Sequence, residues 1–275
     1  MSNVIRLENV SFSFPDEEIP ILSNFSMSIE QGERVVITGP SGCGKSTLLY
    51  LCNRLYPDNC DGIVSGKIEL FGKDSDSYRP GEVNHRIATV FQDPDAQFCM
   101  PTVEEELAFT LENLLVARED MDSRISEVLE ATRLTAYRHS IIQSLSGGMK
   151  QRVATACALI MKPEVLLLDE PITHLDPYTA KQYIEWLDTL QQSSGLTILA
   201  IEHKLDLWED FFHRRIRLKE DRNSLIDDVK RDNRVQQELS LQVEGVSTHS
   251  FLQPSSFSLH KGEVAVLAGP NGSGK

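Results

Sequence analysis

Residues 39–47, Gly-Pro-Ser-Gly-Cys-Gly-Lys-Ser-Thr, decide the fold of this chain. They match the pattern G-x-x-x-x-G-K-[S/T], with a near-continuous β-branched run at residues 34–38 before them and the helical pattern LLYLCNRL after them. In such a loop, glycines let successive backbone N–H groups wrap a phosphate, and the helix that follows adds partial positive charge. The order of strand, loop and helix predicts a phosphate-binding loop in an α/β fold.

Two side chains of this loop have expected roles. We expect Lys45 to place its ammonium against the β- and γ-phosphates of a nucleotide, and the Ser46 hydroxyl to bind Mg²⁺. The thiol of Cys43 is not needed for this, and a redox role for it stays open. The predicted nucleotide-binding residues of the loop are Gly39, Pro40, Ser41, Gly42, Cys43, Gly44, Lys45, Ser46 and Thr47.

A second apolar strand, residues 164–169, ends in the carboxylates Asp169 and Glu170. Ligands of open α/β sheets bind at the carboxyl ends of the strands. We expect Asp169 to hold Mg²⁺, directly or through water. We expect Glu170 to point the other way, because strand residues alternate, and to polarise an attacking water. Taken alone, the segment also fits a strand that ends in solvated acids.

The rest of the chain up to about residue 220 fits an α/β domain. Residues 4–14 and 25–39 read as short strands, and residues 103–161 change to apolar residues at helical spacing. A strand pattern returns at residues 196–202, after a helical stretch at 177–192. We therefore expect an α/β core that contains a helical insertion.

Composition excludes several classes of protein. The 275 residues carry a formal charge of −14, which argues against non-specific nucleic-acid binding. The longest apolar runs fall short of the roughly 18–20 residues of a membrane span, and the N-terminus does not resemble a secretory leader. The five cysteines show no C-x-x-C spacing, so we expect reduced thiols, no zinc site and a cytosolic protein.

Residues 145–152, Leu-Ser-Gly-Gly-Met-Lys-Gln-Arg, resemble the signature motif of ATP-binding-cassette (ABC) proteins, and they lie upstream of the carboxylate strand as that family requires. The resemblance covers residues 1–230. It implies an ATPase of the P-loop NTPase class, with a mostly parallel core sheet, an antiparallel β subdomain and a helical subdomain at about residues 100–160. ATP and Mg²⁺ are the implied ligands.

The resemblance also implies roles for single residues. Phe14 is similar to the aromatic that stacks on adenine, although an ordinary strand aromatic is an open alternative. Gln92 resembles the glutamine that contacts Mg²⁺ and the attacking water. Asp176 resembles an aspartate at the dimer seam, and His203 resembles the histidine that contacts the γ-phosphate. With Glu170, Gln92 and His203 are the implied catalytic residues.

Ser146 and Gly148 open a helix, so their N–H groups form a second anion site. A long helical segment separates them in sequence from the phosphate loop. In the family, the corresponding residues close over ATP bound to the opposite subunit. The implied partner is therefore a second ABC domain, arranged head to tail.

Residues 91–98 and 101–109, with residues 202–204, resemble the ATPases of energy-coupling-factor importers. Such importers take up vitamins, vitamin precursors or transition-metal ions. The implied partners are an integral-membrane coupling protein and a substrate-binding membrane protein, with no nucleic acid. The implied location is peripheral, on the cytoplasmic face of the plasma membrane.

An internal repeat follows residues 221–240, which read as a charged linker. Residues 244–275 repeat the opening of the first domain, and the sequence stops at Lys275 within a second phosphate-loop motif. Ser250 stands where the first copy has Phe14. We expect residues 241–275 to be the start of a second, truncated ABC domain of a tandem protein.

Two other functions stay open. One is a soluble ABC ATPase, such as a ribosome-associated or DNA-repair factor. The other is a nucleotide-binding regulator, or an inactive fragment, that does not hydrolyse ATP. The acidic balance disfavours the first, and intact Glu170 and His203 disfavour the second.

Overall fold

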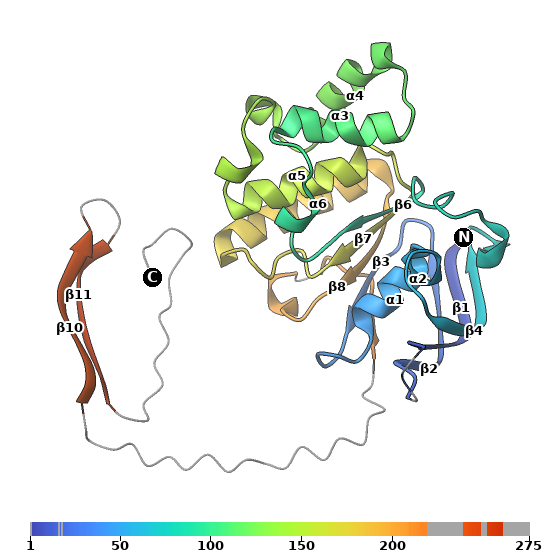
Figure 1. Ribbon diagram of the computed structural model, residues 1–275, viewed down its shortest axis with the longest axis horizontal. Helices are drawn as coiled ribbons and strands as arrows, with labels where there is room; N and C mark the ends of the chain where they lie inside the picture. The colour runs from blue at the N-terminus through green and yellow to red at the C-terminus, as the bar shows by residue number, and fades with distance from the viewer. Residues whose placement is uncertain are drawn as a thin grey trace. The chain divides into compact units, whose positions relative to one another are not determined.

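The computed structural model describes residues 2–15, 17, 19–208, 210–218, 239–248 and 252–260. The chain divides into two compact units, Met1–Asp221 and Arg222–Lys275 (Figure 1).

A five-stranded sheet of parallel strands forms the centre of the first unit, in the order β6-β7-β8-β3-β9. Its apolar β-branched and leucine runs suit strands that are covered on both faces. Alternate residues of β7 contribute to two different clusters: Leu167 to one, and Leu166 and Leu168 to the other. The strands are β3 (Arg34–Thr38), β6 (Ile87–Val90), β7 (Val165–Asp169), β8 (Thr197–Ile201) and β9 (Arg214–Arg217).

A second, antiparallel sheet has the order β2-β1-β4-β5. It shares one apolar cluster with α1 and with the parallel sheet, so α1 lies between the two sheets (Figure 1). Its strands are β1 (Asn3–Ser13), β2 (Leu22–Glu30), β4 (Ile63–Leu70) and β5 (Lys73–Asp74); α1 (Lys45–Cys52) and the short α2 (Leu55–Asp58) follow β3.

The remaining helices form a layer on the other face of the parallel sheet (Figure 1). α3 begins at a capping box in which Thr102 and Glu105 satisfy each other's free N–H groups. α3, α4 and α5 share a third apolar cluster of their own. The helices are α3 (Val103–Asn113), α4 (Arg118–Ala131), α5 (Gly147–Leu159) and α6 (Pro177–Ser194). The predicted fold class, a parallel core with an antiparallel sheet and a helical insertion, is confirmed.

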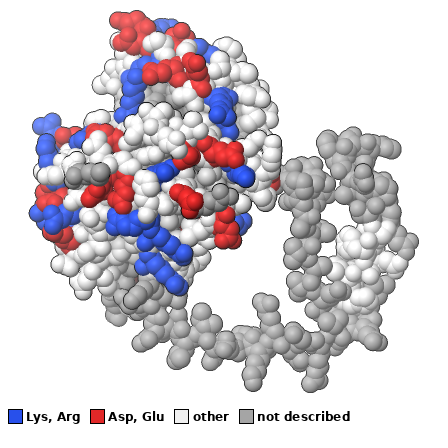
Figure 2. Space-filling view, turned by 180° about the vertical axis from the view of Figure 1, so that it is seen from behind, with Lys and Arg blue, Asp and Glu red and all other residues white. Residues whose placement is uncertain are grey.

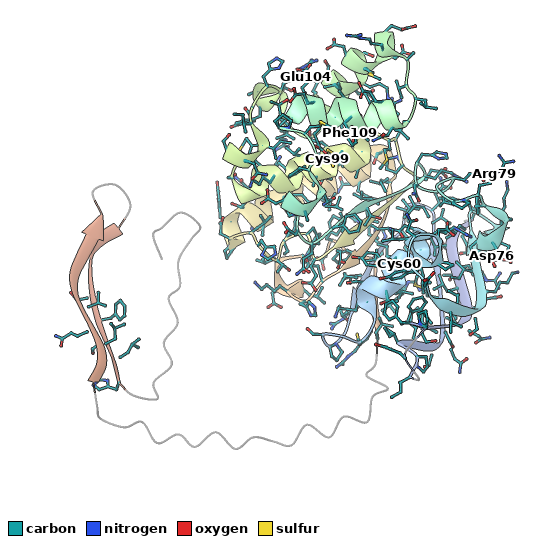
Figure 3. The ribbon with its side chains drawn as sticks, viewed as in Figure 1. Cys60, Asp76, Arg79, Cys99, Glu104 and Phe109 are labelled. Carbon is teal, nitrogen blue, oxygen red and sulfur yellow. The ribbon has the colours of Figure 1, made fainter. Side chains whose placement is uncertain are left out.

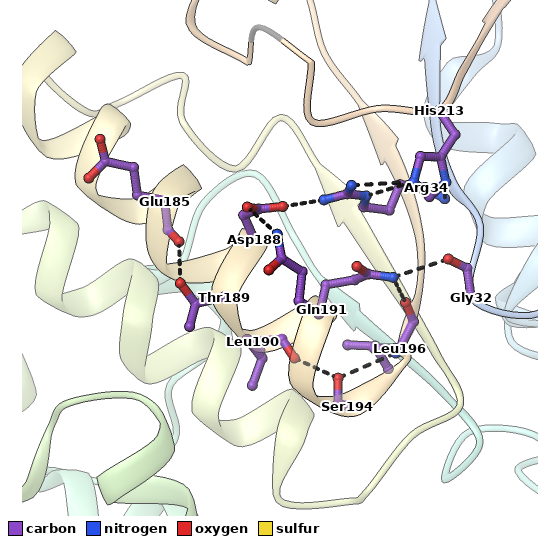
Figure 4. A network of polar contacts seen from close by, with 11 residues as sticks. Gly32, Arg34, Glu185, Asp188, Thr189, Leu190, Gln191, Ser194, Leu196 and His213 are labelled. Atoms are coloured by element: carbon purple, nitrogen blue, oxygen red, sulfur yellow. Dashed lines mark hydrogen bonds and ion pairs between the residues drawn. The ribbon is translucent and has the colours of Figure 1, made fainter.

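Polar contacts fix α6 against the start of β3 (Figure 4). Gln191 donates from Nε2 to the carbonyl oxygens of Gly32 and Leu196, each at 3.1 Å. Arg34 forms an ion pair with Asp188 and hydrogen bonds with His213. These contacts hold the amino ends of the central strands, so the opposite end of the sheet is left for the site.

The edge strand β9 presents exposed arginines, Arg214, Arg215 and Arg217. Charged side chains on an edge strand discourage pairing with another chain. Figure 2 shows that basic and acidic side chains are interspersed over one face of the first unit. None of the helices within the described residues has the length and apolar character that a membrane crossing requires.

The second unit contains an antiparallel hairpin, β10 (Leu239–Thr248) and β11 (Leu252–His260). Its register repeats that of β1 and β2: Leu7 pairs with Met27, and the equivalent Val243 pairs with Phe257. The register shifts fall at equivalent places in both hairpins. The predicted linker up to residue 238, Ser250 and the second phosphate-loop motif lie outside the described residues.

Candidate active site

The phosphate loop joins the end of β3 to the start of α1. Gly42 and Gly44 have φ angles of 78° and 93°, which L-residues with a side chain rarely adopt. Lys45 is buried, and its Nζ donates to the carbonyl oxygens of Gly39 and Pro40 at 3.1 and 2.8 Å. The loop thus wraps around the Lys45 ammonium group. Phosphate oxygens of a nucleotide can take the place of the two carbonyl oxygens as acceptors of its hydrogen bonds.

Asp169, the last residue of β7, lies next to this loop. The Ser46 hydroxyl donates to its Oδ1 at 3.4 Å, and the Tyr50 hydroxyl donates to its Oδ2 at 3.5 Å. Burial raises the pKa of Asp169, and the hydrogen bond from Ser46 opposes that rise. A hydroxyl and a carboxylate at one point fit Mg²⁺, which proteins usually hold with one or two carboxylates and substrate phosphates.

Glu170 is the point where the predicted catalytic side chains meet. Its Oε2 accepts from Gln92 Nε2 at 3.2 Å and from Thr173 Oγ1 at 3.1 Å. His203 Nε2 lies 2.9 Å from its Oε1. Three groups from three different loops therefore converge on one carboxylate at the carboxyl edge of the sheet.

The prediction that strand alternation directs Glu170 is wrong. β7 ends at Asp169, and Glu170 has a φ of 46°, in the left-handed region. Its N–H donates to Ile201 O at 3.1 Å, which fixes this turn against the end of β8. A residue in such a strained conformation is held by its surroundings. The turn, and not the pleat of the strand, directs the carboxylate.

A buried carboxyl lies beneath the histidine turn. Glu202 is 1% exposed, and its Oε2 accepts from the His203 N–H at 3.1 Å. Burial raises the pKa of Glu202 to about 7, against the lowering effect of the N–H groups of His203, Lys204 and Ile172. Glu202 thus contacts the backbone of the histidine turn and lies near that of the Glu170 turn.

Replacement of Glu202 by Gln is expected to flatten the pH dependence of stability. The protonated form is favoured in the fold, so its stabilisation is complete below the usual pKa of 4.5 and lost as pH rises through about 7. The free energy of unfolding of the variant, relative to wild type, should rise by about 3 kcal/mol between pH 5 and 8. Urea unfolding at both pH values measures this.

The matched control is Glu185→Gln on the exposed side of α6. Its difference from wild type should be the same at both pH values. If the free energy of unfolding of Glu202→Gln also differed from that of wild type by the same amount at pH 5 and pH 8, the folded protein would not keep this carboxyl protonated.

The predicted second anion site lies at the start of α5. Ser146 caps the helix, since its Oγ accepts from Met149 N–H at 3.4 Å. Gly148 is buried against α6: a Cβ added there would lie 2.2 Å from Thr179 Cγ2. Thr179 in turn donates from Oγ1 to Asp176 Oδ2 at 2.7 Å. Asp176 caps α6, so the signature segment packs against the residues that follow the predicted seam aspartate.

Replacement of Gly148 by Ala is expected to destabilise the fold by about 1–3 kcal/mol, because it overpacks the contact with Thr179. Adding Thr179→Ser should restore stability, since serine keeps the hydroxyl and removes the methyl. Urea unfolding midpoints measure both effects. Gly147→Ala is the control: the nearest side-chain atom, of Leu175, lies 3.9 Å from an added Cβ. Equal stability of the two alanine variants would contradict the overpacking.

Phe14 lies in an aromatic group. Its ring meets Phe12 and Tyr56 edge to face, with centroids 5.2 and 5.8 Å apart. It follows β1 and packs against the cluster that also contains α1.

Cys43 is half-buried within the phosphate loop, where its N–H donates to Pro40 O at 3.4 Å. This position is compatible with a contribution of Cys43 to phosphate binding through its main chain and not through its thiol.

The sequence reasoning missed three residues that support these groups: Tyr50, Thr173 and Glu202. Tyr50 lies one helical turn after Ser46, a spacing that places both on one face of α1. Thr173 lies three residues after Glu170, within reach of the same turn. Glu202 is a charged residue at the end of an apolar strand pattern, and this position was the sequence signal that could have marked it as part of the site.

A cavity of about 750 Å³ runs from Asp169 and Gln92 to the helical layer. Near the helical layer its lining is mostly apolar and comes from α3, α5 and the segment between β6 and α3, but α3 also contributes polar side chains such as Glu106. Figure 3 shows Cys99 and Phe109 at this layer. The cavity therefore connects the predicted Mg²⁺ and water-positioning residues to an apolar groove.

Known proteins match this fold and these motifs. A profile of the ABC transporter family matches residues 22–173. A Bacillus subtilis protein provisionally named HMP/thiamine import ATP-binding protein YkoD is 36% identical over 99% of this chain. An ABC transporter ATP-binding protein of Pyrococcus abyssi, also provisionally named, is 39% identical over 74% of this chain and 73% of its own length.

Solved structures match in the same way. CbiO1 of Clostridium perfringens, part of the ABC transporter complex cbiONQ, has a TM-score of 0.67 and 30% identity over 75% of this chain and 81% of its own. A dimeric post-hydrolysis state of the ATP-binding cassette MJ0796 with ADP and Pi has a TM-score of 0.65 and 27% identity over 79% and 97%. The chain spans 60% of the length of the Bacillus relative.

Proposed function

We propose that this chain, which belongs to the ABC transporter family of ATPases, is the ATP-binding and ATP-hydrolysing part of an importer of the energy-coupling-factor type. The observation that carries the proposal is the convergence of Gln92 and His203 on Glu170, at 3.2 and 2.9 Å, beside the phosphate loop. A nucleotide held by that loop would have its terminal phosphate near this carboxylate.

The side chains divide the chemistry among them. Lys45 and the N–H groups of the loop hold the phosphates, and Glu170 polarises the attacking water. Gln92 positions that water, and His203 donates to the γ-phosphate. Phosphoryl transfer depends mainly on such positioning and charge stabilisation. Ser46, Asp169 and Gln92 would hold Mg²⁺, which would supply positive charge to neutralise the phosphates.

The nucleotide site is completed by a second ABC domain. The N-terminus of α5, with Ser146 and Gly148, offers unpaired N–H groups and a helix dipole to an anion. Asp176, at the start of α6, lies beside it through Thr179. In a head-to-tail pair this surface faces ATP on the opposite domain. The shared register of the two hairpins supports a second ABC domain that begins near residue 241.

The chain acts at the cytoplasmic face of the plasma membrane, together with integral-membrane coupling and substrate-binding proteins. The apolar groove beside Gln92 is where a membrane partner would sense the state of the nucleotide. The thiamine-import name of the Bacillus relative supports a vitamin or a vitamin precursor as the substrate class, and a transition-metal ion is the alternative for importers of this type.

Affinity purification of the chain from detergent-solubilised membranes of its source cell tests the importer function. We expect a multi-helix membrane protein, identified by mass spectrometry, and a lower recovery of it with Phe109→Asp in the groove. Ile63→Asp, at an exposed position of β4, is the control and should recover it normally. Recovery of ribosomal or DNA-bound proteins alone would contradict the importer and leave the ATPase in place.

A further inference from the structure

An ion pair joins the segment that carries Gln92 to the helix that carries the signature motif. Lys150 Nζ lies 2.7 and 3.0 Å from the two carboxylate oxygens of Asp95. It also donates to Gln143 Oε1 at 3.3 Å, in the loop before α5. One ammonium group therefore contacts the segment after β6 and the approach to α5, while its own backbone lies within α5.

The position of Lys150 is unfavourable for the helix alone. It lies in the opening turns of α5, where its N–H donates to Ser146 O at 2.9 Å. A cation near a helix N-terminus opposes the helix dipole. The Lys150 side chain is only 13% exposed, against 46% for Asp95. The ion pair with Asp95 offsets the unfavourable interaction between Lys150 and the helix dipole. Helix formation alone therefore does not explain a lysine at this position.

The segment between Gln92 and Asp95 is short and ordered. Asp95 N–H donates to Asp93 Oδ1 at 3.0 Å, and Gln97 N–H donates to Pro94 O at 3.1 Å. Three residues span at most about 10 Å. The backbone segment between Gln92 and Asp95 is therefore too short to take up a large movement of Gln92, and such a movement also displaces Asp95.

The later part of the same segment is held by a different helix. The buried Glu106 of α3 accepts at Oε2 from the N–H groups of Cys99 and Met100, at 2.9 and 2.7 Å. Asp95 provides the side-chain ion pair from this segment to α5 among the described residues. The connection to the signature helix can therefore be removed while the anchor to α3 is kept.

We propose that Lys150 is a positioning residue for hydrolysis: through Asp95 it links the N-terminus of α5 to Gln92. This role of Lys150 rests on the proposed function, in which two ABC domains pair head to tail. Gln92 then responds to nucleotide on its own domain, while the N-terminus of α5 faces nucleotide on the other. The pair transmits the state of one site to the other, and such coupling acts equally in both directions.

Removal of the pair is expected to affect hydrolysis and not binding. In Lys150→Met and Asp95→Asn, kcat should fall about five- to tenfold, and the Hill coefficient for ATP should approach one. The Kd for a fluorescent ATP analogue should stay within about twofold, because the phosphate loop is intact. A partly exposed ion pair contributes little to folding, so both variants should unfold at the wild-type urea concentration.

A double-mutant cycle in the full chain decides the matter. The combined variant should be no worse than either single variant, and the exchange Asp95→Lys with Lys150→Asp should recover part of the lost kcat. Lys162→Met is the control, since Lys162 pairs with Glu127 on the exposed side of the helical layer, at 3.0 Å. It should behave as wild type.

Additive losses, or an unchanged kcat and Hill coefficient in both single variants, would overturn the role of the pair. If wild type hydrolyses ATP and Glu170→Gln does not, such a result leaves the proposed function intact. A wild-type chain that binds ATP without hydrolysing it would instead refute the proposed function, and the role of Lys150 with it.

Discussion

Replacement of Glu170 by Gln is expected to slow phosphate release from Mg·ATP by at least about 100-fold while ATP binding persists. The amide has nearly the same volume as the carboxylate, but it carries no charge and cannot polarise water. It also offers one oxygen to the three donors of Gln92, Thr173 and His203 that now contact Glu170. A coupled phosphate assay measures the rate, and a fluorescent ATP analogue measures binding.

The same variant should accumulate as an ATP-bound dimer, because in the proposed head-to-tail pair hydrolysis is the step that separates the two ABC domains. Sedimentation velocity with and without Mg·ATP detects it. The control is Glu127→Gln on the exposed side of α4, which should hydrolyse ATP at the wild-type rate. Normal hydrolysis by Glu170→Gln would remove Glu170 from its assigned role.

Replacement of Lys45 by Ala is expected to weaken ATP binding by about ten- to a hundredfold, the value of a hydrogen bond to a charged group. The Lys45 ammonium lies within the loop on the carbonyl oxygens of Gly39 and Pro40. Without it, two carbonyl groups turn toward the phosphates instead of a cation. Calorimetric titration with Mg·ATP, and with ATP alone, measures the loss.

Cys43→Ser is the matched control in the same loop. We expect this variant to bind ATP as wild type does, because only the main chain of Cys43 faces the phosphates in the proposed arrangement. Circular dichroism should show that Lys45→Ala keeps its fold. Wild-type affinity in Lys45→Ala would place the nucleotide somewhere other than the loop at residues 39–47.

Much of the fold could be predicted because its signals are local. The apolar run at residues 34–38 and the loop after it specify a buried strand and a phosphate site within a few residues. The same holds for the end of β7 at Asp169. The helical insertion follows from apolar spacing within α3 and α5, which share a cluster of their own.

The direction of Glu170 could not be predicted in this way. Strand periodicity ends at Asp169, and the following turn takes a left-handed conformation fixed by Ile201 of another strand. The burial of Glu202 likewise depends on packing between β8 and the neighbouring turn. Both properties arise from contacts between segments distant in sequence, which a local pattern does not contain.

The pair of Asp95 and Lys150 shows the same limit more strongly. Each residue belongs to a motif with a recognised resemblance, yet nothing in either motif indicates that the two side chains meet. Only the return of α5 alongside the segment after β6 brings them together. The sequence therefore predicts the components of the site, and the structure supplies the connections between them.

The most direct test of the proposed function is phosphate release from Mg·ATP by the purified wild-type chain, recorded in the same samples as binding of a fluorescent ATP analogue. We expect saturable binding and Mg²⁺-dependent release in wild type, and binding without release in Glu170→Gln. Binding without release in wild type, or equal release in both proteins, would contradict the assignment of an ATPase site to Lys45, Asp169 and Glu170.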